Sequence, residues 1–145
     1  MNRVMKLSPI VVGIAAMIAC GSDSAAPPSA LVGTYNAFTF TTTGSSGQTN
    51  QLSAGSTLTI NLAANGSTTG HLHVVASGSN PVLDADMAGT WTQTGNSVTF
   101  SQAADTFVRN MTFAVAPASS SAWDLVGNGT FSGTAVALTL RQVVP

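Results

Sequence analysis

The sequence predicts an all-β fold, best described as an eight-stranded antiparallel up-and-down barrel, and three observations lead to it. Its polar residues are mostly Thr, Ser, Asn and Gln, with 14 Gly among 145 residues, and charged residues make up only 6%. Such a composition favours half-buried strands and lacks the charged residues typical of helix surfaces. From Leu31 onward, short apolar/polar alternations recur roughly every 8–15 positions between turn residues. All connections are short, and closing the sheet removes its exposed edges, although a Greek-key sandwich would have the same local signals.

The first expected strand spans roughly 32–42. Phe38 and Phe40 share one face of it, but Tyr35 is out of phase with both. We therefore expect a bulge or bend near Asn36.

Alternation and turn residues define the other seven strands. Asn65-Gly66, a dipeptide typical of type I′ hairpins, joins the second strand to the third, and Gly95-Asn96 and Ser132-Gly133 mark two further turns. The expected ranges are 57–62, 71–76, 85–94, about 98–100, about 106–116, 123–131 and 136–140. The core is expected to consist of Phe38, Phe40, Leu58, Ile60, Leu62, Leu72, Val74, Trp91, Phe100, Met111, Phe113, Trp123, Leu138 and Leu140.

The charge balance argues against nucleic-acid binding. From residue 20 onward, Arg109 and Arg141 stand against five Asp, so 2 − 5 gives a net charge of −3 without any Lys or Glu. Such a surface cannot neutralise many phosphates. No nucleic-acid partner is expected.

The N-terminal segment has the features of a secretory signal. Arg3 and Lys6 precede an apolar run that ends at Cys20, the only cysteine, and the run is shorter than the ~20 residues of a membrane-spanning helix. Ile18-Ala19-Cys20-Gly21 resembles the lipobox of bacterial lipoproteins, with Met17 where that family most often has Leu. The resemblance implies cleavage before Cys20, a thioether-linked diacylglyceryl on its sulfur and usually a further acyl chain on its new amino group.

This resemblance sets the expected organisation of the chain. Residues 1–19 form a lipoprotein signal peptide, residues 20–30 the lipidated cysteine and a flexible tether, and residues 31–145 the barrel domain. Two or more acyl chains hold a protein stably on a membrane. We expect a lipid-anchored, extracytoplasmic protein of the bacterial envelope, and Gly21-Ser22 favours the outer membrane by the sorting rule of enteric lipoproteins.

A second resemblance concerns the barrel. Leu31-Val32-Gly33-Thr34-Tyr35 is similar to the Gly-x-Trp start of lipocalins, with Tyr35 in place of Trp, although the helix that follows the lipocalin barrel is lacking. In size the domain is nearer the avidin and fatty-acid-binding relatives. The resemblance implies that Arg141 packs across Tyr35 at the closed barrel end, a stacking of a guanidinium on an aromatic face. It also implies an interior suited to a small apolar ligand.

Arg109 is the main candidate for contacting such a ligand. In the expected strand 106–116 it shares an apolar face with Phe107, Met111 and Phe113, and an inward Arg could pair with the carboxylate of a lipid or another anion. The alternatives are that Arg109 lies at the barrel mouth or pairs with Asp105. The predicted ligand-binding residues are Arg109, Trp91, Trp123 and Phe113. Gly127 and Gly129, on the inward face of 123–131, either leave room beside the aromatics or relieve crowding.

A weaker candidate is a metal site formed by His71, His73, Asp84 and Asp86. Residues two apart on a strand project to one face, so the four side chains would converge if their strands pair. The alternative is that all four lie on the solvent face, and no metal or cofactor is predicted. No Gly-x-Ser-x-Gly elbow is present, so we do not expect an enzyme.

The expected function is ligand binding, and a structural or protein-interaction role is its alternative from a different class. In the first, the lipid-anchored barrel binds a small apolar or amphipathic ligand inside. In the second, the barrel is filled by its own side chains and the protein has a structural or protein-interaction role in the envelope.

Overall fold

The computed structural model describes residues 29–76 and 81–144. These residues form one short 3-10 helix and ten strands. They are η1 (Ser29–Leu31), β1 (Gly33–Gly44), β2 (Gly47–Asn50), β3 (Thr57–Leu62), β4 (Ser67–Val74), β5 (Leu83–Asp86), β6 (Gly89–Thr94), β7 (Ser97–Gln102), β8 (Thr112–Pro117), β9 (Trp123–Phe131) and β10 (Thr134–Gln142). In this part of the chain, no helix has the length and hydrophobicity needed to cross a bilayer.

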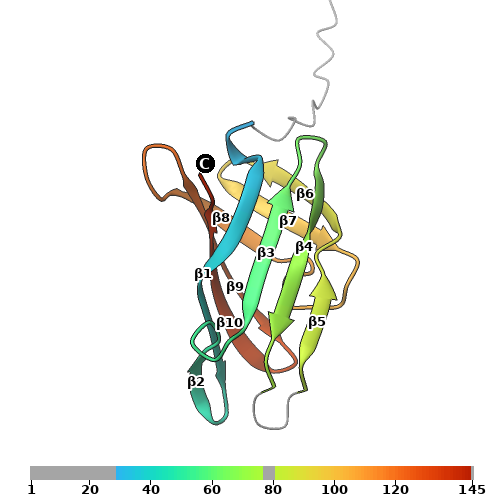
Figure 1. Ribbon diagram of the computed structural model, residues 1–145, viewed down its shortest axis with the longest axis vertical. Coiled ribbons are helices and arrows are strands. Elements are labelled where there is room, and N and C mark those ends of the chain that lie inside the picture. Colours follow the sequence, from blue (N-terminus) through green and yellow to red (C-terminus); the bar gives the residue numbers. More distant parts are fainter. Residues whose placement is uncertain (1–28, 77–80, 145) are drawn as a thin grey trace, which may run out of the picture.

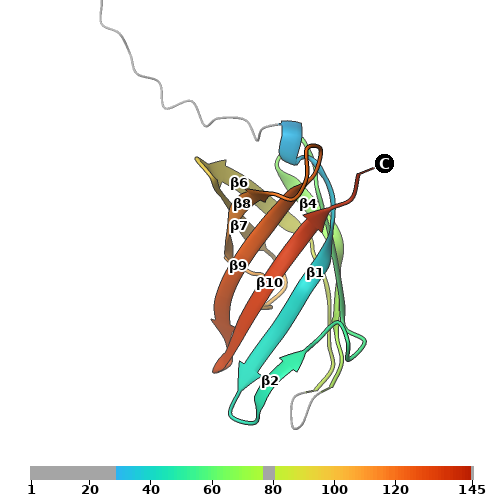
Figure 2. The same cartoon turned by 90° about the vertical axis from the view of Figure 1, so that its left-hand side faces the viewer.

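The predicted closed barrel is confirmed. Eight antiparallel strands, β1, β3, β4, β6, β7, β8, β9 and β10, follow one another around it, and β10 closes the circle by pairing with β1. Figure 1 shows η1 and the start of β1 at the upper end, and Figure 2 shows β9, β10, β1 and β2 side by side. Each of the two remaining strands pairs with one barrel strand: β2 pairs with the lower half of β1, and β5 pairs with the lower half of β4.

The predicted strand 85–94 is divided into β5 and β6, and both pair with β4 in the same continuous register. Leu83–Asp86 pair with the lower half of β4, and Gly89 and Thr90 pair with its start. Between them the Met87 amide donates a hydrogen bond to the Gly70 carbonyl at 3.0 Å. A Cβ on Gly70 would lie 2.1 Å from the Thr59 carbonyl oxygen, so this close approach of β4 to β3 requires glycine.

The expected irregularity in the first strand is also present. The register between β1 and β10 shifts between Ala37 and Thr39, which leaves Phe38 as the extra residue of a bulge. Tyr35 and Phe40 consequently both point inward and are buried, whereas Phe38 is 52% exposed. The assignment of Phe38 to the core was wrong, because the bulge reverses the side on which it projects.

The predicted strand 106–116 is correct only in its second half. β8 begins at Thr112, and residues 103–111 form a loop in which the Val108 amide donates to Thr106 Oγ1 and Asn110 has a φ of 62°. Val108 is fully buried, and the Phe107 ring lies 5.1 Å from that of Phe40. The loop places Val108 in the core and packs Phe107 against it, so burial favours the loop over the strand that the alternation predicted.

Side chains fill the interior. The largest ones with less than 2% exposure are Trp91, Tyr35, Phe40, Phe100, Phe113, Leu58, Ile60, Leu62, Leu72, Met87, Leu125 and Leu138. Apart from Phe38, the expected core residues are buried or, for Val74 and Trp123, partly buried against the core. Two buried polar side chains, Thr68 and Gln102, hydrogen-bond each other at 2.9 Å, which compensates the loss of water.

Candidate functional site

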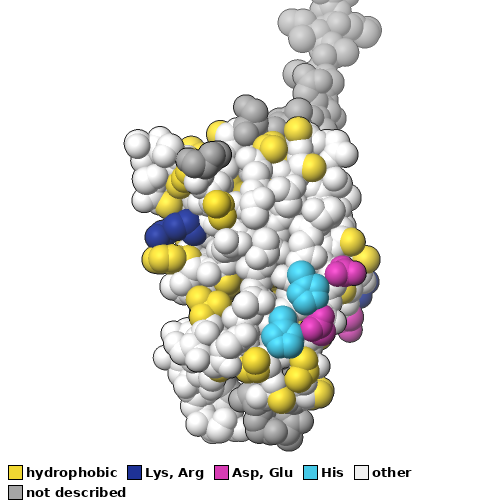
Figure 3. Space-filling view, in the orientation of Figure 1, with side chains coloured by type: hydrophobic (Ala, Val, Ile, Leu, Met, Phe, Trp, Pro, Cys, Tyr) yellow, Lys and Arg dark blue, Asp and Glu magenta, His cyan; other side chains and the backbone are white. Residues whose placement is uncertain are grey.

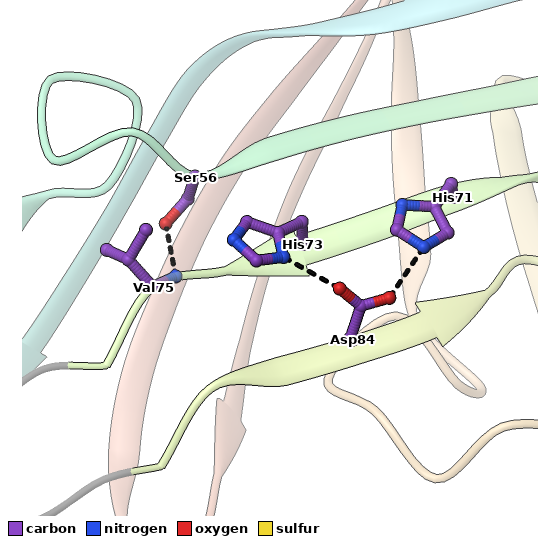
Figure 4. Close-up of polar contacts among 5 residues, drawn as sticks. All are labelled: Ser56, His71, His73, Val75 and Asp84. Atoms are coloured by element: carbon purple, nitrogen blue, oxygen red, sulfur yellow. Dashed lines mark hydrogen bonds and ion pairs between the residues drawn. The ribbon is translucent and has the colours of Figure 1, made fainter.

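The most concentrated group of ionisable side chains lies on the outer surface of β4 and β5. His73 stands opposite Asp84 in the sheet, and His71 lies diagonally across from it. The two imidazoles contact different oxygens of the same carboxylate: His71 Nε2 lies 2.7 Å from Asp84 Oδ1, and His73 Nδ1 lies 2.8 Å from Asp84 Oδ2 (Figure 4). The sequence therefore identified three residues that do meet.

The chemistry of this cluster is that of a carboxylate held by two donors. Because an ionised carboxylate only accepts hydrogen bonds, His71 donates from Nε2 and His73 from Nδ1. The hydrogen bond from His73 is the main cause that lowers the pKa of Asp84, and the one from His71 acts in the same direction. All three side chains are solvent-accessible, at 50% for His71, 37% for His73 and 55% for Asp84.

The arrangement does not support the metal-site hypothesis. Asp86 is exposed and lies opposite His71, but it is not part of the hydrogen-bonded cluster. Each imidazole nitrogen is directed at its own carboxylate oxygen rather than toward a common point. Within residues 29–76 and 81–144, no group of three or more His, Cys, Asp or Glu is arranged to hold a metal ion.

Ser56, which lies near His73 in Figure 4, has a structural role. It is buried, donates from Oγ to Gln51 Oε1 at 3.1 Å and accepts the Val75 amide at 3.1 Å. These contacts fasten the loop after β2 to the end of β4. Neither of these two hydrogen bonds of Ser56 Oγ involves the His73 ring, so Ser56 and His73 are not arranged as a nucleophile and its base.

The aromatic residues predicted to bind a ligand are part of the packed interior. Trp91 is 1% exposed, and its indole Nε1 donates to the Ala63 carbonyl at 2.9 Å. The fully buried Phe113 ring lies 5.0 Å from the Phe100 ring. Trp123 is partly buried at the upper end.

Arg109 does not belong to this group. The prediction that it faces inward from a strand was wrong, because it lies in the 103–111 loop with 46% of its side chain exposed. Its Nη1 lies 3.6 Å from Asp105 Oδ1, so the pairing with Asp105 that was considered as an alternative is observed.

The predicted contact between Tyr35 and Arg141 is also wrong. Tyr35 is buried and donates its hydroxyl to the Leu31 carbonyl at 3.0 Å. Arg141 stands on the outside, with its guanidinium 3.4 Å from the centre of the Phe38 ring. It also pairs with Asp124 through two hydrogen bonds of 2.9 and 2.8 Å, which raise the pKa of Arg141. Arg141 follows an inward Leu140, so strand alternation places it on the outer face.

Sequence reasoning missed this group of Phe38, Arg141 and Asp124. Asp124 stands directly opposite Arg141 across β9 and β10, and its side chain is only 13% exposed. The signal available in the sequence was that Tyr35 is out of phase with Phe38 and Phe40, since a bulge located at Phe38 itself places Tyr35 and Phe40 inside and Phe38 outside.

Two open hollows lie on the surface of the described residues. One, of about 250 Å³, is bordered by the start of β3 and the bulge of β1. The other, of about 380 Å³, lies at the upper end between Val32–Thr34, Ser121 and Gln142–Val144. Neither is lined by Arg109, Trp91, Trp123 or Phe113.

Comparison of the chain with protein-family models, with curated proteins and with solved structures finds no match. The expected lipidation residue, Cys20, lies outside the described residues.

Proposed function

We propose that this chain is a lipid-anchored lipoprotein of the bacterial envelope, attached through Cys20, and that its barrel acts through its outer surface in a structural or protein-interaction role. The lipobox-like Ile18-Ala19-Cys20-Gly21 supports the anchor. The packed interior supports a role for the outer surface, and this is the observation on which the proposal depends most.

The position of Phe113 illustrates how full the interior is. A Cβ placed on Gly127 would lie 2.6 Å from two carbons of the Phe113 ring, well inside the ~3.5–4.0 Å of favourable carbon–carbon contact. Gly127 thus relieves crowding rather than leaving room for a ligand. A small molecule inside the barrel would have to displace side chains that are fully buried.

Native mass spectrometry of residues 21–145, extracted gently from cells, tests this part of the proposal. We expect the bare polypeptide mass and no shift with a panel of fatty acids and other small anions. The Phe113→Ala variant provides the positive control, since apolar cavities of this kind bind small aromatic molecules such as benzene. A reproducible extra mass on the wild-type chain, removable by organic solvent, would instead establish the ligand-binding alternative.

The anchor is tested separately in bacterial cells. The wild-type chain should incorporate labelled fatty acid and sediment with membranes, whereas Cys20→Ser should do neither. Ser22→Cys combined with Cys20→Ser is a matched control, because it restores a thiol two residues from the cleavage site. Fatty-acid incorporation by the Cys20→Ser chain would contradict lipidation at this residue.

A further inference from the structure

The upper end of the barrel, from which the chain continues toward Cys20, carries no charged side chain. We define this upper rim by its described segments, 30–34, 63–66, 94–97, 117–122 and 142–144. None of them contains Asp, Glu, Lys, Arg or His. The described residues together hold two Arg and four Asp, so the net charge of 2 − 4 = −2 arises entirely elsewhere.

The charged groups lie lower on the barrel or are paired. His71, His73 and Asp84 form the cluster on β4 and β5, and the Asp105–Arg109 pair lies in the loop between β7 and β8. Among the residues that the structure describes, the charged side chains nearest to the rim are Asp124 and Arg141, which neutralise each other through two hydrogen bonds. Figure 3 shows hydrophobic and uncharged side chains at the upper end, with the histidines and acidic residues below.

The rim also exposes apolar surface in a fixed conformation. Val143 is 49% and Val144 is 47% exposed, and both border the hollow of about 380 Å³. The Val143 amide donates to the Thr34 carbonyl at 2.8 Å, which holds this segment against β1. Gln142 Nε2 adds hydrogen bonds to the Ala30 and Val32 carbonyls, at 3.1 and 3.2 Å.

The length of the chain toward Cys20 limits how far this rim can be from the anchor. Residues 20–28 separate it from Ser29, and nine residues span at most about 30 Å when fully extended. If Cys20 is lipidated, the rim therefore lies within about 30 Å of the bilayer surface. A rim without charged side chains and with exposed valines suits the interface of zwitterionic lipids, and docking through it keeps the four Asp of the described residues away from the membrane.

We propose that the upper rim is a membrane-docking surface, which rests on the bilayer interface through Val143, Val144 and the hollow beside them, without a requirement for anionic lipid. This inference rests on the proposed lipid anchor and adds an orientation to it: the His71–Asp84–His73 cluster and the lower end face away from the membrane.

Single-cysteine labelling of the lipidated full-length chain tests the orientation. Ser120→Cys places a fluorescent label on the rim, and Ser45→Cys places one on the exposed connection between β1 and β2 at the opposite end. In phosphatidylcholine vesicles with a spin-labelled lipid, we expect quenching of the label at 120 and none at 45. Equal quenching at both positions, or none at 120, would overturn the proposal.

Substitutions at two valines of similar exposure distinguish docking through the rim from non-specific adhesion of the protein to vesicles. Val143→Asp should abolish quenching at 120, whereas Val82→Asp, whose parent side chain is 53% exposed at the lower end, should leave it unchanged. Quenching at 120 only when phosphatidylglycerol is present would contradict the uncharged docking surface. If the fluorescence of the label at 120 changes with protein concentration in the absence of vesicles, the rim instead contacts a second copy of the chain, and the membrane-docking proposal is wrong.

Failure of the anchor remains distinguishable from failure of docking. Flotation with the vesicles and the mass of the N-terminal fragment report lipidation directly. If Cys20 carries no lipid, its thiol can be coupled to a maleimide lipid, with Ser120→Lys and Ser45→Lys as labelling sites, since residues 20–145 contain no other lysine. The same quenching pattern is then required.

Discussion

Gly127→Ala tests the close packing of the barrel interior most directly. The added Cβ would stand 2.6 Å from Cδ1 and Cε1 of Phe113 and 3.2 Å from Cγ. The ring would have to retreat by roughly 1 Å to reach ordinary contact. Phe113 is fully buried and already packs against Phe100, so we expect the ring to have little free space into which to move.

The expected loss of stability follows from two opposing effects. Overpacking a tight core costs about 1–3 kcal/mol. Replacing glycine by alanine returns about 0.4–1 kcal/mol, because it restricts the unfolded chain. Gly127→Ala should therefore lower the free energy of unfolding by about 1–2 kcal/mol, a decrease in Tm of roughly 4–8 °C for a domain of this size.

Gly129→Ala is the matched control on the same strand and face. Its Cβ would meet only the flexible end of Met111, at 3.4 Å, so the variant should be as stable as the wild type or slightly more stable. Urea unfolding and thermal denaturation of both variants measure the difference. If Gly127→Ala is as stable as Gly129→Ala, the Phe113 ring has room to move, the interior holds unused volume, and the argument for a filled barrel is refuted.

Three further predictions concern ionisable groups. Burial raises the pKa of Tyr35, the only tyrosine, so stability should decline by ~1.4 kcal/mol for each pH unit above about 10, and tyrosinate absorbance should appear only with unfolding. The pKa of Asp84 is lowered in the folded state, so its ionised carboxylate stabilises the fold at pH values above the pKa of the unfolded chain. The difference in unfolding free energy between wild type and Asp84→Asn, measured by urea unfolding, should therefore shrink as the pH falls below about 4. Arg141→Leu should lower the Tm measurably, because it leaves the mostly buried Asp124 carboxylate without its partner, whereas Arg109→Leu should leave the Tm unchanged within error, since its pair with Asp105 is exposed. Equal Tm values for these two variants would contradict the reasoning.

Much of the barrel could be predicted because strand alternation is a local property. Leu58, Ile60 and Leu62 lie on one face whatever they pair with, and short turns leave few ways to connect neighbouring strands. The phase conflict between Tyr35 and Phe38 likewise revealed a bulge before its position was known. The alternation could not show which of the two aromatics faced inward, and therefore missed the stacking of Arg141 on Phe38.

The candidate site was only partly predictable. His71 and His73 share a face by alternation alone, but their convergence on Asp84 rather than Asp86 depends on the register between β4 and β5. Arg109 and Phe107 alternate as they would in a strand, yet burial of Val108 and the stacking of Phe107 on Phe40 stabilise a loop instead. Alternation cannot reveal such a competition, because its outcome depends on residues far apart in the chain.

The sequence by itself determined the all-β class, the number of barrel strands, most of the inward faces and the scarcity of charge that leaves the upper rim uncharged. Only the tertiary structure decided whether the interior is occupied. Gly127 was compatible with an open space or with a crowded one. The distance from a Cβ placed on Gly127 to the Phe113 ring distinguishes the two, and that distance is set by how strands β8 and β9 pair.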